Sequence, residues 1–139
     1  MTQAHGMSEM VQEPFVAGNA GDHTAVIVKA VVRAAEFWGL TNAEGAALFD
    51  VPTATWSRMK AGEFRGKLDH DKTMRASLIV GIFKALHLLF NGPLTDGWPK
   101  RPNTGPLFDG QTPTAYMIER GIPGMMAVRQ HIDALRGGM

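Results

Sequence analysis

The chain has 139 residues, of which 45% are apolar and 19% charged, an ordinary composition for one folded domain or two small helical modules. It contains no cysteine, which excludes disulfides, thiolate metal sites and a thiol nucleophile. No apolar run approaches the roughly 20 residues that span a bilayer, and the N-terminus lacks the pattern of a secretion signal. We therefore expect a cytoplasmic protein with no membrane contact.

The first 22 residues differ in composition from the rest of the chain. They carry Glu9, Glu13 and Asp22 and no lysine or arginine, so without these three carboxylates the net charge rises from +1 to +4. They are also poor in periodic apolar positions. This composition predicts a flexible tail over residues 1–22, with ordering against a partner as the alternative.

Three helices are expected in the next forty residues. Residues 24–38 repeat apolar and polar positions at helical spacing, and a glycine follows. Thr-Asn-Ala-Glu at 41–44 has the residues of a capping box, which predicts a short helix to about Phe49. Pro52 blocks an uninterrupted continuation and fits the first turn of a second short helix that ends near Gly62.

A long apolar helix is predicted over residues 71–90, with Asp71 as its cap. Its main face carries Met74, Leu78, Ile82, Leu86 and Leu89. Its apolar surface is widened by Ile79, Val80, Phe83 and Leu88. A helix this apolar is either central to the core or partly buried in an oligomer interface, and we expect a dimer whose interface includes it. Gly81, in its middle, would allow a close approach of another segment.

The remaining C-terminal segment begins with an irregular connection. Prolines and glycines over residues 91–112 predict a long loop, anchored by Trp98, Leu107 and Phe108. Thr112-Pro113 is a helix start, Gly121 ends that helix, and Pro123 opens the last one. The core face of the last helix is expected to consist of Met125, Val128, Ile132 and Leu135.

Residues 45–62 meet the requirements of a helix-turn-helix: a small residue where two helices cross, apolar residues that lock them, and a tight turn. Ala46 is the expected small residue. The expected apolar lock consists of Phe49, Val51, Trp56 and Met59. Asp50 occupies the turn position where glycine is common, and aspartate tolerates left-handed backbone better than most residues.

The second helix of this pair supplies the candidate DNA-binding residues. Its exposed positions are predicted to be Thr53, Ala54, Ser57, Arg58 and Lys60. Hydroxyl and guanidinium groups suit base edges and phosphates. Many pairs of short helices in helical cores never touch DNA, so a purely structural role stays an alternative.

Four sequence elements occur together in the C-terminal third. They are an Asn-Pro-Leu-Phe-Gly-Gly-like turn at residues 103–110, Thr-Pro at 112–113, Gly-Ile-Pro-Gly at 121–124, and Asp-Ala-Leu-Arg-Gly at 133–137. With this combination, the chain resembles the Xre/MbcA/ParS antitoxins over roughly residues 24–139. Asp109 replaces the first of the two usual glycines, so we expect that turn to differ in detail.

The resemblance implies an all-α protein, in which an Xre-like helix-turn-helix bundle precedes a small helical toxin-binding domain. The boundaries expected are residues 1–22 for the tail, 23–92 for the helix-turn-helix and dimerisation region, and 93–139 for the toxin-binding domain. The resemblance also implies an antitoxin of a type II toxin-antitoxin system. Such a protein would form a homodimer, bind and block a RES-domain toxin that consumes NAD, and repress its own operon by binding operator DNA.

Candidate toxin-binding residues are those of the last helix that point away from its expected core face. They are Met126, Arg129, Gln130, Asp133 and Arg136. Methionine adapts to irregular pockets, and arginine is favoured at interfaces because its planar group binds carboxylates through two hydrogen bonds. Without the resemblance, residues 102–137 would be interpreted as a helical hairpin with a satisfied core.

No catalytic pattern is found, so we expect no enzyme activity and no cofactor. Asp69-His70-Asp71 contains metal-ligating residue types, but adjacent residues ahead of a helix are typical of a cap and a solvated loop, and no metal site is expected. No nucleophile elbow, phosphate-binding loop or dinucleotide motif is present. Two alternatives remain: an interaction module with a structural helix-turn-helix, or a transcription regulator that responds to something other than a toxin.

Overall fold

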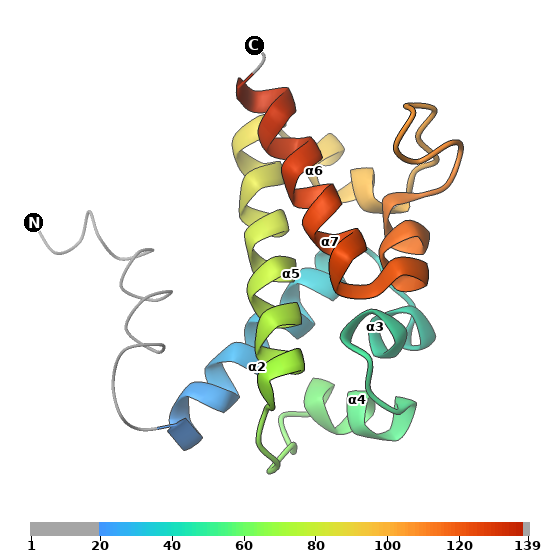
Figure 1. The fold of residues 1–139 in the computed structure, drawn as a ribbon. Helices are drawn as coiled ribbons and strands as arrows, with labels where there is room; N and C mark the ends of the chain where they lie inside the picture. Colours follow the sequence, from blue (N-terminus) through green and yellow to red (C-terminus); the bar gives the residue numbers. More distant parts are fainter. Residues whose placement is uncertain (1–19, 138–139) are drawn as a thin grey trace, which may run out of the picture.

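The computed structural model describes residues 20–137, which form a bundle of helices (Figure 1). The elements are α2 (Ala20–Phe37), α3 (Asn42–Phe49), α4 (Thr53–Lys60), α5 (His70–Leu89), α6 (Pro93–Gly97), the 3-10 turn η2 (Trp98–Lys100) and α7 (Pro113–Gly137). No strand occurs among these residues, and the predicted all-α class is confirmed.

The longest helices form the centre of the molecule. α5 and the second half of α7 lie side by side and run in the same direction, and α2 passes behind α5 (Figure 1). α3 and α4 lie near the start of α5, away from the C-terminal end of α7 (Figure 1). All of these helices contribute to one core. Its fully buried large side chains include Val31, Leu48, Phe49, Ile79, Ile82, Leu86, Phe108, Met117, Met125, Val128 and Ile132. Burial of each contributes about 1.5–3 kcal/mol relative to exposure.

α2 begins at Ala20, four residues before the predicted start at Thr24. The apolar face of the helix is buried as expected, and Trp38, directly after its last residue, is also buried. The last three residues of the predicted tail, 20–22, therefore belong to the helix. The rest of the prediction for residues 1–22 lies outside the described residues.

α5 differs from its prediction at both ends. Asp69, and not Asp71, is the N-cap, because its side chain accepts a hydrogen bond of 2.9 Å from the backbone amide of Lys72. Met74 is 38% exposed and Leu88 is 70% exposed, so the apolar surface of this helix is wider than the core that covers it.

The connection between α5 and α7 is more regular than predicted, since it contains α6 and η2. Two of its three expected anchors, Trp98 and Phe108, are buried, and Leu107 is half-buried. Pro93 and Pro99 each stand near the start of a short helical turn, where their missing N–H is tolerated. Local proline-initiated turns are therefore the reason that this segment is not a plain loop.

α7 consists of two helices that meet at a sharp break. Gly121 has φ 68° and ψ −146°, a backbone conformation that only glycine adopts readily, so the predicted break is confirmed. Met125, Val128 and Ile132 are fully buried as expected, but Leu135 is 41% exposed and does not belong to the core. Within residues 20–137, the last turn of α7 therefore extends beyond the part of the helix that the core covers.

Candidate functional site

α3 and α4 form the predicted pair of crossed helices. The capping box is present: the Thr41 hydroxyl accepts from the Glu44 amide at 3.1 Å, and the Glu44 carboxylate accepts from the Thr41 amide at 2.9 Å. Asp50 ends α3 in the left-handed region, with φ 60° and ψ 53°. This is the turn geometry that a helix-turn-helix requires, and aspartate supplies it in place of glycine.

Gly45 lies at the crossing of the two helices, next to the predicted small residue Ala46. A Cβ atom added at Gly45 would lie 2.5 Å from two carbons of the Trp56 ring. Ala46 is buried as well, and both residues belong to the packed side of α3. Of the expected lock, Phe49, Trp56 and Met59 are buried and Val51 is half-buried. The sequence signal for Gly45 is a glycine inside a capped helix, where it weakens the helix unless close packing requires it.

All five candidate DNA-binding residues are exposed. They are Thr53, Ala54, Ser57, Arg58 and Lys60. Arg58 donates a hydrogen bond of 3.2 Å to the Thr55 hydroxyl, and Lys60 donates one of 2.8 Å to the Asn42 side chain at the start of α3. The arrangement presents short polar side chains, alanine and two cations on the solvent side of α4.

Ion pairs tie α3 to the rest of the molecule. The Lys100 ammonium contacts the Glu44 carboxylate at 2.6 Å. Burial alone would raise the pKa of Glu44, but hydrogen bonds from Lys100 and the Thr41 backbone outweigh it and hold that pKa below 4.5. Arg75 donates to the Leu48 carbonyl at 3.0 Å and lies 3.9 Å from the Asp50 carboxylate. The turn of the helix-turn-helix is thus held by α5, and its first helix by η2.

The candidate toxin-binding residues lie on one side of the second half of α7. Asp133 is paired with both arginines, at 3.1 Å from the Arg129 Nε and 3.4 Å from the Arg136 Nη1. Met126 and Gln130 are exposed beside them. The Arg129 side chain is half-buried because it lies across α5, where its guanidinium occupies the space that a Cβ atom at Gly81 would need. The structure therefore brings these residues together and extends their surface onto α5.

The turn of residues 103–110 is closed by its own hydrogen bonds. The side-chain oxygen of Asn103 accepts from the Gly105 amide at 3.1 Å, and the backbone carbonyl of Asn103 accepts from the Gly110 amide at 2.8 Å. Asp109 adopts a left-handed conformation, with φ 51°. The turn is anchored by Phe108, whose ring contacts those of Trp98, Tyr116 and His131 with centroids 5.3–5.7 Å apart. Its role in the molecule is to support the start of α7.

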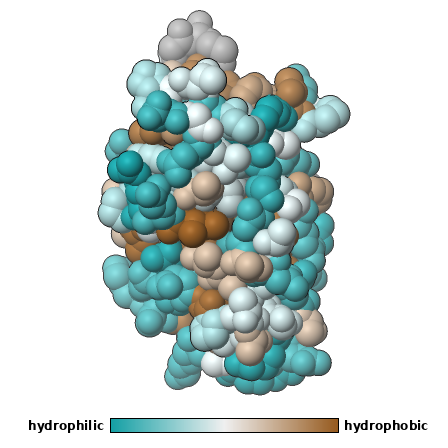
Figure 2. All heavy atoms as spheres, turned by 90° about the vertical axis from the view of Figure 1, so that its right-hand side faces the viewer, coloured by the Kyte–Doolittle hydropathy of each residue, from teal (hydrophilic) through white to brown (hydrophobic). Residues whose placement is uncertain are grey.

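The face of the molecule that carries α3, α4 and this turn is mostly hydrophilic, with apolar atoms in small separate patches (Figure 2). Within the described residues, no group of three or more histidine, aspartate or glutamate side chains is arranged to hold a metal ion. Among the same residues, none of the helices has the length and hydropathy to cross a membrane.

Two protein-family models match this chain, one for each of the surfaces described above. Residues 18–81 match the antitoxin Xre-like helix-turn-helix domain, and residues 85–138 match the antitoxin Xre/MbcA/ParS C-terminal toxin-binding domain. The chain belongs to the Xre/MbcA/ParS antitoxin family. The helix-turn-helix of this antitoxin is the pair formed by α3 and α4, and its toxin-binding domain includes the paired arginines of α7.

A relative of this antitoxin is the "Uncharacterized protein y4oB" of Sinorhizobium fredii (strain NBRC 101917 / NGR234). The two are 34% identical over 114 residues, which cover 80% of this chain and 84% of the relative. The two matched domains of the antitoxin meet between residues 81 and 85, inside α5. One helix therefore belongs to both domains.

Proposed function

We propose that this antitoxin neutralises a RES-domain, NAD-consuming toxin by binding it through α7, and that it represses its own operon as a DNA-binding dimer in the cytoplasm. It acts by occupying surfaces and catalyses no reaction. The observation that carries the toxin-binding part is the ion-paired group of half-buried Arg129 with exposed Asp133 and Arg136, within the segment that matches the toxin-binding domain.

The chemistry of this group suits a protein partner. One carboxylate is shared by two guanidinium groups, so each arginine keeps further N–H donors for a partner's carboxylates or carbonyls. The exposed Met126 supplies an apolar contact beside them. Because Arg129 lies on α5 at Gly81, its position is fixed before binding, which reduces the entropy lost on association.

The test of toxin binding is the double charge reversal Arg129→Glu with Arg136→Glu. We expect toxin affinity to fall about 100-fold or more, because interfacial arginines then become carboxylates next to Asp133. The matched control is Arg101→Glu with Arg120→Glu, which changes the charge equally in the same half of the chain at two exposed positions. Circular dichroism must show both variants to be as helical as the wild type.

Two results would contradict this surface. If the folded α7 variant still bound and silenced the toxin at wild-type affinity, the surface would lie elsewhere. If the control lost as much affinity as the α7 variant, the effect would reflect overall charge. Co-purification with the product of the adjacent reading frame, followed by a measurement of NAD loss when that product is expressed alone, tests the identity of the toxin.

The proposal of operon repression depends on the exposed side of α4. If Arg58 reaches a base edge, Arg58→Ala should weaken operator binding by about 1–3 kcal/mol and leave toxin neutralisation unchanged. A dimer would contact two half-sites about 34 Å apart, or a multiple of that distance. Footprinting of the chain's own promoter that shows no protected site would refute repression and leave the helix-turn-helix a structural element.

A homodimer is supported by apolar side chains left exposed on α2 and α5. Phe37 is 49% exposed, and its ring lies 5.6 Å from that of Phe83, which in turn lies 4.3 Å from the ring of His87. Leu88 is the most exposed large apolar residue among those described. Covering such a surface with a second copy removes it from water.

A further inference from the structure

Among the described residues 23–69 of the helix-turn-helix half, two carboxylates form ion pairs but no lysine or arginine does. Its cations between residues 23 and 69 are Lys29, Arg33, Arg58, Lys60, Arg65 and Lys67. In the described part of the chain, no carboxylate oxygen lies within 4.0 Å of any of them. Two carboxylates of the same segment, Glu44 and Asp50, are instead paired with Lys100, Lys72 and Arg75 from outside it. The surface of this half is therefore more positive than its composition indicates.

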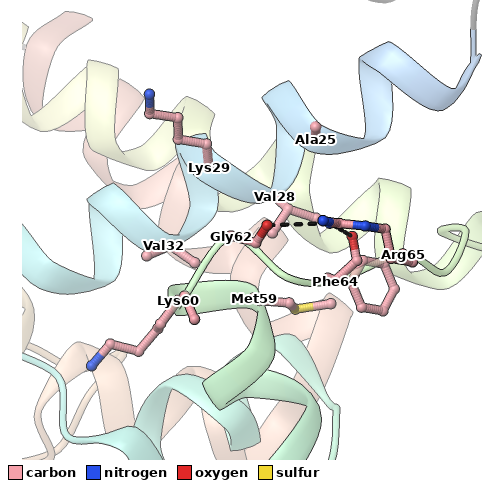
Figure 3. A pocket seen from close by; sticks show the side chains of 10 residues that line it. Ala25, Val28, Lys29, Val32, Met59, Lys60, Gly62, Phe64 and Arg65 are labelled. Carbon is pink, nitrogen blue, oxygen red and sulfur yellow. Dashed lines mark hydrogen bonds between the residues drawn. The ribbon is translucent and has the colours of Figure 1, made fainter.

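Three of these cations surround one pocket. The pocket has a volume of about 360 Å³ and lies between α2, the end of α4 and the segment that follows it (Figure 3). Its buried lining is apolar and includes Val28 and Met59. Lys29, Lys60 and Arg65 are exposed around it; the ammonium groups of Lys29 and Lys60 diverge, one upward and one downward in the view, and Arg65 lies on the opposite side of the pocket (Figure 3).

Two of the three side chains are held in place by hydrogen bonds. Lys60 donates to the Asn42 side chain at 2.8 Å. Arg65 donates to the carbonyls of Gly62 and Phe64 at 3.2 and 3.4 Å through its Nη1, which leaves its other nitrogens for a ligand. Side chains that are ordered beforehand lose less conformational entropy when they bind an anion.

We propose that Lys29, Lys60 and Arg65 form a phosphate-binding rim that holds the DNA backbone beside the groove entered by α4. The inference rests on the proposed DNA binding and adds residues of α2 and of the loop after α4 to the binding surface. Lys60 is the last residue of α4, so the rim continues directly from the candidate base-contacting face. Duplex DNA carries one negative charge per roughly 1.7 Å of its axis, so a helix in its groove has phosphates at both ends.

The rim explains how a recognition helix with few basic residues could bind DNA. Phosphate contacts fix the position and orientation of a protein on the duplex and carry no sequence information directly. In this arrangement, the cations outside α4 supply affinity and the exposed face of α4 supplies specificity. The two contributions can therefore be separated by experiment.

The test uses Lys29→Gln with Arg65→Gln, two positions outside the exposed face of α4. Its matched control is Arg101→Gln with Arg120→Gln, which removes the same charge from the C-terminal half. Binding of the full chain is measured at several salt concentrations to a labelled duplex from its own promoter and to an unrelated duplex of equal length. Circular dichroism confirms that each variant is folded.

We expect the rim variant to lower the slope of log affinity against log salt by about two per bound protomer. Near 0.1 M salt this corresponds to a loss of roughly tenfold per contact, equal for both duplexes. A rim variant with the slope and affinity of the wild type would overturn the phosphate-binding rim, as would a control that lowers the slope equally. A wild-type chain that binds neither duplex would overturn DNA binding as well, which distinguishes the two failures.

Discussion

Gly45 provides a direct test of how α3 and α4 are locked together. The substitution Gly45→Ala adds one methyl group where α3 crosses α4. That carbon would lie 2.5 Å from Cε2 and Cζ2 of Trp56 and 2.8 Å from its Nε1. Ordinary contacts begin near 3.4 Å, so the ring must move by about 1 Å. Trp56 is buried and its ring also pairs with that of Phe49, so it has no open space to enter.

Two opposing terms set the size of the effect. Replacing glycine by alanine inside a helix stabilises it by about 1 kcal/mol. Overpacking of a filled core costs about 1–3 kcal/mol, and a rigid ring that cannot move outward favours the upper end. We therefore expect a net loss of about 2 kcal/mol, or a Tm lower by roughly 7 °C in a domain of this size.

Thermal and urea unfolding measure this loss, and two further variants assign its cause. Ala47→Gly, on the exposed side of the same helix, should destabilise the protein by about 1 kcal/mol, which gives the propensity term alone. Trp56→Phe removes the atoms nearest to the new methyl group, so the double variant with Gly45→Ala should lose about 1 kcal/mol less than the sum of the single losses. A Gly45→Ala variant as stable as the wild type, or strictly additive losses, would show that the crossing is not close-packed.

The remaining predictions concern assembly, pH and capping. Light scattering at tens of micromolar should give the mass of a dimer, and Phe37→Glu should shift it toward a monomer; a monomeric wild type, with or without toxin, would refute the dimer. Burial lowers the pKa of His131 below 6.5, so its neutral form is favoured in the fold and its contribution to stability is lost as the pH falls below that value. His131→Phe should therefore lose less stability than the wild type between pH 7.5 and 5, and an unchanged pH dependence would contradict this role. Asp69→Ala should cost about 1 kcal/mol in urea unfolding by removing the cap of α5, and no loss would mean that the cap is formed by another group.

Much of the fold could be predicted from the sequence, because its helices are bounded by strong local signals. The capping box at Thr41, the left-handed turn at Asp50 and the break at Gly121 depend on a few adjacent residues, and all three are present. The wrong predictions concern features that depend on how the helices are placed in three dimensions. Leu135 continues the apolar stripe of α7, yet among the described residues it stays 41% exposed near the end of the helix. Asp69 and Asp71 could both cap α5, and only the backbone geometry selects Asp69.

The candidate surfaces were predicted less completely, since contacts across the chain shape them. Exposure of the α4 positions followed from helical periodicity, but the pairing of Asp133 with both arginines and the contact of Arg129 with Gly81 required the packing of α5 against α7. The close packing of Gly45 at the helix crossing was missed for the same reason. Gly45 precedes the predicted Ala46, and only the position of the Trp56 ring shows that a Cβ atom at Gly45 has no room.

The two halves share one core, which limits how their functions can be separated. Removal of residues 123–139 would be expected to abolish toxin neutralisation, but Met125, Val128 and Ile132 are fully buried and pack against α5. The same helix holds the turn of the helix-turn-helix through Arg75 and the Leu48 carbonyl. We therefore expect this deletion to abolish DNA binding as well, with a loss of helical signal in circular dichroism. In the intact protein, the surface substitutions in α7 and α4 are therefore the way to separate the two functions. A truncated chain that stays folded and still binds its promoter would show instead that the helix-turn-helix half folds and functions independently.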